Sequence, residues 1–249
     1  MKFKLKNWSA KIAKNLPQPK SWQEFAYGEA QINALSEAFA PHCSLISGYQ
    51  VIKLGNLSGE LALNLPMRHQ ILLQTEQHTS KRADFTRLLN TNDSQIIANF
   101  TKLPFLNQSI NAAFLLQTLN FAQDPHQILR EVQRVLADDG LLFLSLYNPL
   151  SLNAYKPRQG GYRFRLFPRW RVIDWLALLN FDVLLQQNVN PNGVTHSPFA
   201  PLSILIAQKK FSTLTLNTEK SHWHFPPIWQ GVGEFKPALQ TPKTANVEK

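Results

Sequence analysis

The segment from Tyr49 to Lys209 alternates short apolar runs with segments of helical periodicity, and this alternation strongly constrains the fold. The apolar runs place Ile, Leu and Val at adjacent positions, as in strands that are buried on both faces. Helices between such strands predict a doubly wound, mostly parallel, Rossmann-like α/β sheet with helices on both faces. The seven predicted strands are 49–54, 70–75, 95–100, 111–118, 141–147, 181–187 and 203–209.

One predicted helix has clear signals at both ends. Asp124 stands at its N-cap and Pro125 at its first helical position, Ala137 lies in its last turn, and Gly140 terminates it. Its apolar residues recur at helical intervals, which indicates that one face packs on the sheet. The other predicted helices are 21–39, capped by Ser21, a short one from about Ser58, one through 81–90, and 168–180.

The sequence predicts a single domain with two appendages. Residues 1–44 form a basic arm and a helix, 45–211 form the α/β domain, and 212–249 read as a largely flexible tail with little periodicity. No apolar run is long enough for a membrane span, and the N-terminus lacks the pattern of a secretory signal. Cys43 is the only cysteine, so we expect a buried thiol and a reducing, cytoplasmic location.

The net charge of +10 is concentrated in two stretches without acidic residues. Residues 1–20 contain six lysines, and residues 156–171 contain six basic residues interleaved with aromatic ones. Basic and aromatic side chains together suit phosphates and stacked bases, so an anionic partner such as nucleic acid is one interpretation of 156–171. A solvated loop whose aromatic residues pack on the next helix is the other.

The glycine-containing stretch VIKLGNLSGE, residues 51–60, is the main candidate for a binding loop. It lacks the spacing of a phosphate-binding P-loop and of a complete Gly-x-Gly-x-x-Gly motif. It also differs from a hydrolase nucleophile elbow, because Ser58 stands one position too late. The seven histidines are scattered, and we predict no metal site.

Three further segments resemble one family. They are ANFTKLPF at 98–105, the strand that follows Ser109, and the run from Asp124 to Leu152. Over roughly residues 45–210 the chain resembles class I S-adenosylmethionine-dependent methyltransferases of the type 11 domain group. The resemblance implies S-adenosyl-L-methionine as cofactor and methyl transfer by in-line displacement from its sulfonium.

In that family the first strand ends in acid-x-Gly-x-Gly-x-Gly, which aligns with residues 53–59. Gly55 and Gly59 are kept, with Asn56 beside the first glycine, whereas Leu57 replaces the middle glycine and Lys53 replaces the acid. The family's acid helps to hold the cofactor's ammonium group. Lys53 therefore either repels that ammonium or binds the cofactor's carboxylate, and both alternatives stay open.

The resemblance also assigns positions outside this loop. Asn99 matches the family's acid at the adenine edge, and the Phe100 backbone N–H faces a ring nitrogen. Glu76 is the candidate carboxylate for the ribose hydroxyls, and Gln117 lines the place where methyl donor and acceptor meet. The residues indicate no catalytic base.

Three functional hypotheses follow from the sequence. The first is a methyltransferase whose acceptor and oligomeric state the sequence leaves open. The second is a non-catalytic binding or scaffold protein of the same fold, with weak or no cofactor binding, which the altered positions Lys53 and Leu57 favour. A nucleotide-binding enzyme of another doubly wound type is the third, and the missing phosphate-binding glycines disfavour it.

Overall fold

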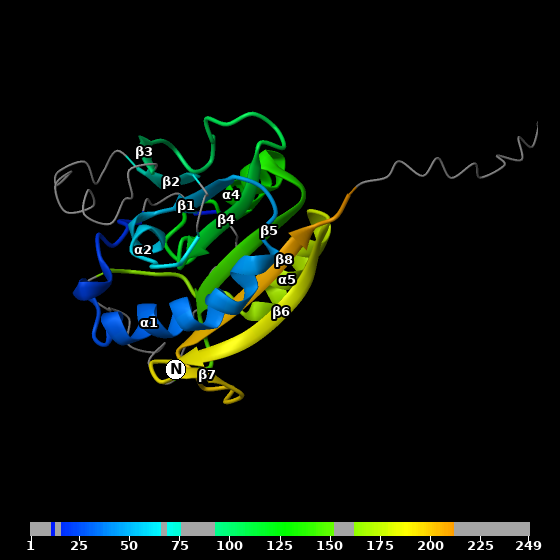
Figure 1. The fold of residues 1–249 in the computed structure, drawn as a ribbon. Coiled ribbons are helices and arrows are strands. Elements are labelled where there is room, and N and C mark those ends of the chain that lie inside the picture. The colour runs from blue at the N-terminus through cyan, green and yellow to red at the C-terminus, as the bar shows by residue number, and fades with distance from the viewer. Residues whose placement is uncertain (1–10, 13–15, 66–68, 76–92, 152–161, 212–249) are drawn as a thin grey trace, which may run out of the picture. The chain divides into compact units, whose positions relative to one another are not determined.

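The computed structural model describes residues 11–12, 16–65, 69–75, 93–151 and 162–211. The strands in this part of the chain are β1 (Gln50–Leu54), β2 (His69–Gln74), β3 (Ser94–Ile97), β4 (Ile110–Leu116), β5 (Leu136–Tyr147), β6 (Phe181–Asn190), β7 (Gly193–Thr195) and β8 (Leu202–Lys209). They form one sheet in the order β3-β2-β1-β4-β5-β8-β6-β7 (Figure 1). The predicted fold class is therefore confirmed, with β7 as an additional strand.

The first five strands are parallel, and the direction of winding reverses between β1 and β4. From β1 the chain adds β2 and then β3 on one side, and it returns to add β4 and β5 on the other side. Loops that follow β1 and β4 consequently leave the sheet in opposite directions. In open α/β sheets, a crevice at such a switch point is the usual place for a ligand.

The last three strands continue the sheet in antiparallel pairs. β8 pairs with β5 so that Leu202 lies opposite Tyr147 and Gln208 lies opposite Leu141. The amino end of β8 therefore lies at the same edge as the carboxyl end of β5. β6 joins β8, and β7 folds back on β6 in a short hairpin. A strand of three residues is too short to produce a detectable alternation in the sequence, so β7 was not predicted.

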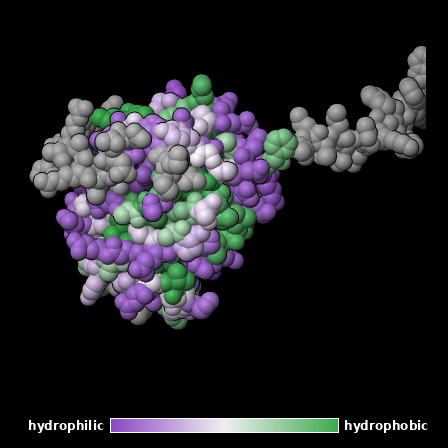
Figure 2. All heavy atoms as spheres, in the orientation of Figure 1, coloured by the Kyte–Doolittle hydropathy of each residue, from purple (hydrophilic) through white to green (hydrophobic). Residues whose placement is uncertain are grey.

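Helices cover both faces of the sheet, as predicted. They are α1 (Gly28–Phe39), α2 (Asn56–Gly59), α4 (Pro125–Val135) and α5 (Arg169–Leu178). Val132 of α4 and Leu176 of α5 pack in one core cluster with Ile52. On the opposite face, α1 packs Phe39 against the stacked rings of Phe114 and Phe143, whose centroids are 4.4 Å apart. In the view of Figure 2, hydrophilic and hydrophobic residues are interspersed over the surface.

The helix predicted at 21–39 is divided into two. Ser21 does cap a helical turn, but this is the short 3-10 helix η1 (Trp22–Glu24), and α1 begins only at Gly28. Tyr27 between them is left-handed, with φ of 63°. A Cβ on Gly28 would lie 1.8 Å from the carbonyl oxygen of Trp22, so the close approach requires glycine. Trp22 is fixed from the other side, because its indole N–H donates to the Leu57 carbonyl at 2.9 Å.

The boundaries of α4 are correct at its start and wrong at its end. Asp124 accepts from the backbone N–H of Gln127 at 3.1 Å, and Pro125 opens the helix. The helix stops at Val135, two residues before the predicted Ala137, because Leu136 already pairs with Ile110 in the sheet. A register shift then places Leu141 opposite Ala112 and includes the turn-like residues 137–140 in β5. Tertiary pairing therefore outweighs the local signal for a helix end.

Several other sequence predictions meet the structure directly. Cys43 is buried, as expected, and its thiol lies 3.4 Å from the Phe39 carbonyl oxygen. The helix predicted through 81–90 and the tail at 212–249 lie outside the described residues. None of the described helices combines the length and the apolar character that a membrane span requires.

The aromatic stack at the centre of the sheet predicts a large effect of truncation. Phe143→Ala removes a fully buried ring that contacts both Phe114 and Phe39, and it should lower the free energy of unfolding by about 3–5 kcal/mol. Leu178→Ala, at a side chain that is 84% exposed, should change it by less than about 0.5 kcal/mol. Urea denaturation measures both, and equal effects would contradict the assigned core.

Candidate functional site

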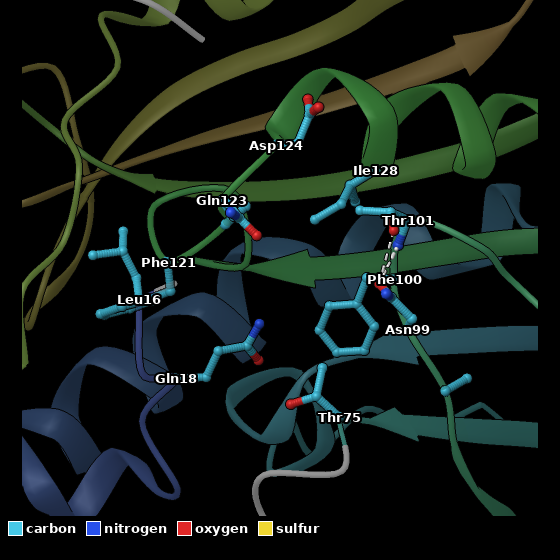
Figure 3. Close-up of a pocket in the computed structure, with 12 residues that line it drawn as sticks. Leu16, Gln18, Thr75, Asn99, Phe100, Thr101, Phe121, Gln123, Asp124 and Ile128 are labelled. Atoms are coloured by element: carbon cyan, nitrogen blue, oxygen red, sulfur yellow. Dashed lines mark hydrogen bonds between the residues drawn. The ribbon is translucent and has the colours of Figure 1, made fainter. Parts of the chain in front are cut away.

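A cavity of about 320 Å³ lies at the carboxyl ends of the parallel strands, beside the switch point. Thr75 follows β2, Asn99 and Phe100 follow β3, and Gln123 lies in the loop between β4 and α4 (Figure 3). Gln18, from the segment before η1, closes the opposite side. Segments that are far apart in the sequence thus meet where the topology predicts a ligand.

The structure places two predicted site residues, Asn99 and Phe100, together in the wall of this cavity. Asn99 is exposed, and its side-chain oxygen accepts from both the backbone N–H and the hydroxyl of Thr101, each at 2.9 Å. Phe100 is buried, and its ring comes within 3.9 Å of the position of a Cβ on Gly55. The segment after β3 therefore meets the glycine loop after β1.

A pair of charged side chains on α4 holds the segment that contains Asn99. The Glu131 carboxylate accepts from the Leu103 backbone N–H at 2.9 Å, and Arg134 donates to the carbonyl oxygens of Leu103 and Phe105 at 3.0 and 2.9 Å. The two side chains also form a 2.9 Å ion pair. The hydrogen bond from Arg134 is the main reason why the pKa of Glu131 lies below its usual value.

The glycine loop keeps its turn in a modified form. Gly55 has φ of 89°, a conformation that favours glycine, and α2 starts directly after it at Asn56. Leu57, which replaces the family's middle glycine, lies inside α2 without a positive φ and packs in the core with Leu61. The leucine is therefore accommodated without backbone strain.

Ser58 is a structural residue of this loop. Its side chain is fully buried, and its hydroxyl donates to the Leu54 carbonyl at 2.6 Å and accepts from the Leu116 N–H at 2.8 Å. Both the burial and the two hydrogen bonds oppose a role as nucleophile. The hydroxyl joins the end of β1 to the end of β4.

Lys53 is buried beneath the loop, and it does not line the cavity. Its ammonium group donates to the Leu61 carbonyl at 2.8 Å, which ties β1 to the chain after α2. Burial lowers the pKa of Lys53 from 10.5 to about 8, against an opposing effect of Asp93. In this structure the ammonium group of Lys53 binds a backbone carbonyl. Neither repulsion of the cofactor's ammonium group nor binding of its carboxylate is needed to explain the position of the side chain.

The chain segment before η1 narrows the site next to the glycine loop. A second cavity of only about 10 Å³ lies between Gly55 and Thr118, and Gln18 and Pro19 form part of its wall. The Asn56 side-chain amide approaches the Pro19 carbonyl at 3.4 Å. The site therefore has a wide part along β3 and β4 and a narrow part at the glycine loop.

Gln117 lies at the end of β4 in an unusual environment. It is fully buried with φ of 50°, and neither polar atom of its side chain has a hydrogen-bond partner among the described residues. Unpaired buried amides are uncommon and costly, and they concentrate at functional sites. Gln117 is absent from the lining of both cavities, so its role as a pocket residue stays a prediction.

The remaining sequence assignments have mixed outcomes. Glu76 lies outside the described residues. A Cβ on Gly59 would lie 2.8 Å from the side chain of Leu72, so the glycine at this position allows α2 to pack on β2.

Two cavity residues were not predicted as site residues. Asp124 was recognised only as a helix cap, although it also lines the cavity. Gln18 gave no sequence signal because it precedes the domain's first strand. No three His, Cys, Asp or Glu side chains converge as a metal site within the described ranges.

Comparisons with known proteins agree with this fold. The profile of a family described as a methyltransferase domain matches residues 52–144. The uncharacterised protein YafS of Escherichia coli is 30% identical over 241 residues, which cover 90% of this chain and 95% of YafS. A methyltransferase solved with the Haloferax volcanii activator Trm112 superposes with a TM-score of 0.58 at 13% identity, covering 74% of this chain and 92% of the other. An S-adenosylmethionine-dependent methyltransferase of Thermotoga maritima gives 0.54 at 18% identity, with coverages of 76% and 91%.

The contact between Glu131 and Arg134 predicts a pH-dependent effect of mutation. A carboxyl group whose folded pKa is depressed stabilises the fold above its unfolded pKa, and this stabilisation is lost as pH falls through the folded value. Glu131→Gln should therefore lower stability by about 1–3 kcal/mol at pH 7. The difference from wild type should shrink below about pH 4.5. Thermal unfolding at several pH values measures it, and Glu37→Gln at an exposed site of α1 is the control.

Lys53 predicts a pH effect of the same direction in a more alkaline interval. Between pH about 8 and 10.5 the unfolded chain keeps the Lys53 proton while the folded chain releases it, so stability contributed by this site rises with pH. Relative to Lys53→Met, wild type should gain up to about 3 kcal/mol over that interval. Urea unfolding of both proteins at pH 7.5 and 10.5 measures the gain, and a constant difference would show that Lys53 is not desolvated.

Proposed function

We propose that this chain, which belongs to the family of YafS and has a class I methyltransferase fold, is an S-adenosylmethionine-dependent methyltransferase. The observation that carries the proposal is the cavity at the switch point, where the segment after β3 meets the glycine loop. The methyl acceptor is unidentified. The fold alone does not establish an activity, so the proposal depends on the chemistry of this site.

The wide part of the site suits the adenosine end of the cofactor. Its volume of about 320 Å³ is near the lower end of the range for small-molecule pockets, about 300–1,000 Å³. In this proposal the exposed amide of Asn99 binds the adenine edge, with the backbone of Phe100 next to it in the cavity wall. Because the Asn99 oxygen already accepts from Thr101, its capacity to accept from an adenine amino group is reduced.

In this proposal the narrow part holds the cofactor's amino-acid end. Gly55 has the turn that lets a ligand approach the backbone. The space beside it is only about 10 Å³, so binding there requires Gln18 to move away from Gly55. The Gln18 oxygen lies 3.6 Å from the position of a Cβ on Gly55, at van der Waals contact. Rotation of the Gln18 side chain, together with a shift of its backbone, would open this space for the ligand.

When bound, the cofactor would supply an electrophilic methyl group on its sulfonium. The contribution of this chain is to position the two reactants and to exclude water. Asn99 and Phe100 would orient the adenosine end, while Gly55 and Asn56 would hold the amino-acid end. The proposal assigns no general base: Asp124 lines the cavity but caps α4, and His126 packs at the start of α4 against Trp175.

A non-catalytic role is the second candidate function. It is favoured by the small space at the glycine loop and by Lys53, which occupies the position of the family's acid and bonds to the protein instead. A binding or scaffold protein with this fold would retain the wide cavity without productive cofactor binding. The two functions differ in whether the intact cofactor binds.

Isothermal titration with S-adenosylmethionine and S-adenosylhomocysteine tests the proposal. Wild type should bind both, and Asn99→Asp should tighten binding about three- to tenfold, because a carboxylate offers a second oxygen besides the one used by Thr101. Asn107→Asp makes the same change at an exposed site outside the cavity and should leave affinity unchanged.

Absence of heat with either ligand at millimolar concentration would contradict the methyltransferase proposal and support the non-catalytic role. Equal tightening by Asn99→Asp and Asn107→Asp would contradict the assigned adenine position, since it would reflect added negative charge alone.

A further inference from the structure

A cluster of arginines and aromatic rings adjoins the cavity. The guanidinium carbon of Arg165 lies 4.8 Å from the ring centroid of Phe167, and that of Arg171 lies 5.6 Å from the ring of Trp175. The two rings are 5.3 Å apart, and His126 packs on Trp175 at 4.2 Å. We call these five residues, together with Arg130, the basic–aromatic cluster.

The cluster concentrates positive charge. Burial is the first cause that lowers the pKa of His126, and the neighbouring Arg130, Arg171 and Arg165 lower it further. Asp124 opposes them, but it also lies 3.9 Å from the ammonium of Lys11. Arg171 likewise lowers the pKa of Arg165, after burial. Within the part of the chain that the structure describes, three guanidinium groups and the Asp124 carboxylate act on this histidine, and an anionic ligand would stabilise that arrangement.

The first turn of α5 strengthens this effect. Arg169 and Arg171 occupy that turn, which contains no acidic residue, and the N-cap Pro168 has no side chain to accept from the amides. A helix N-terminus disfavours cations and attracts anions. Trp170, in the same turn, is 60% exposed. Arg169 donates to the Asn188 side-chain oxygen at 3.2 Å, while Arg171 lies over the ring of Trp175 in the cluster.

Hydrogen bonds fix the cluster to the wall of the cavity. The backbone N–H of Arg165 donates to the Asn120 carbonyl at 2.8 Å, and its guanidinium approaches the Ala122 carbonyl at 3.5 Å. Ala122 and Asp124 line the cavity. A molecule bound at the cluster would therefore lie beside the carboxyl end of β4, next to the proposed cofactor site.

We propose, building on the methyltransferase function above, that the methyl acceptor carries a phosphate ester that binds at Arg165 and Arg171. Arginine suits this role because its planar guanidinium donates two parallel hydrogen bonds to phosphate oxygens. The aromatic faces hold the guanidinium groups in place, and exposed Trp170 offers a surface on which a base can stack. The phosphate belongs either to a free nucleotide or to a single-stranded nucleic acid.

The test measures binding of three probes without cofactor: inorganic phosphate, adenosine 5′-monophosphate and a labelled single-stranded RNA oligomer. Arg165→Gln/Arg171→Gln should weaken binding of the two esters at least tenfold. Lys210→Gln removes one charge just after the carboxyl end of β8. This is the end of the sheet away from the cavity, so the variant should have no effect. Tighter binding of RNA than of the mononucleotide assigns the phosphate to a polymer, and the reverse assigns it to a free nucleotide.

The proposal is overturned if no probe binds, or if Lys210→Gln weakens binding as much as the double variant does. Circular dichroism and thermal unfolding verify that the variants fold. If the double variant is unfolded, Arg171→Gln alone decides, with Arg171→Lys as a variant that keeps the charge and loses the paired hydrogen bonds. Because the cofactor titration is a separate experiment, failure of methyltransferase function is distinguished from failure of phosphate binding.

Discussion

The hydroxyl of Ser58 joins β1 and β4 at the point where the sheet divides, and the candidate site is built around this connection. β1 ends at Leu54, so the Leu116 N–H of β4 finds no backbone carbonyl beside it in the ladder and donates to Ser58 instead. The Ser58 hydroxyl in turn donates to the Leu54 carbonyl. The Thr118 hydroxyl donates to the same carbonyl at 2.8 Å. Buried backbone groups need such partners, and these bonds hold the ends of β1 and β4 together beside the glycine loop.

Two further constraints shape the crevice from its sides. Glu131 and Arg134 hold the chain after β3, which fixes Asn99 and Phe100 at the wide part. Trp22 donates to the Leu57 carbonyl within α2, and Lys53 donates to the Leu61 carbonyl just after it. Lys53, at the position that aligns with the family's acid, is thus a structural anchor, and Gln18 lines the cavity. Under the proposed function, cofactor affinity would depend on how readily the segment with Gln18 moves.

Sequence patterns predicted the regular elements well where periodicity was strong. The strands and α4 followed from apolar runs and from the Asp124-Pro125 start, because burial and capping act locally in the sequence. The prediction was wrong where a distant partner decides the outcome. Gly28 breaks the N-terminal helix because it packs on Trp22, and Leu136 leaves α4 because it pairs with Ile110. The candidate residues Asn99, Phe100 and Gly55 came from the resemblance, and the structure brings them into one region.

By itself, the sequence determined the fold class, the parallel core and the position of the glycine turn, since these follow from hydrophobic period and from residue-specific backbone preferences. Tertiary structure alone decided the direction of the Lys53 side chain, the contact of Gln18 with the glycine loop, and the gathering of Arg130, Arg165 and Arg171 around His126. Most of these features join segments that only the tertiary fold brings together, such as Gln18 and Gly55. Their geometry depends on the strand order and on helix packing, which leave no periodic signal in the chain.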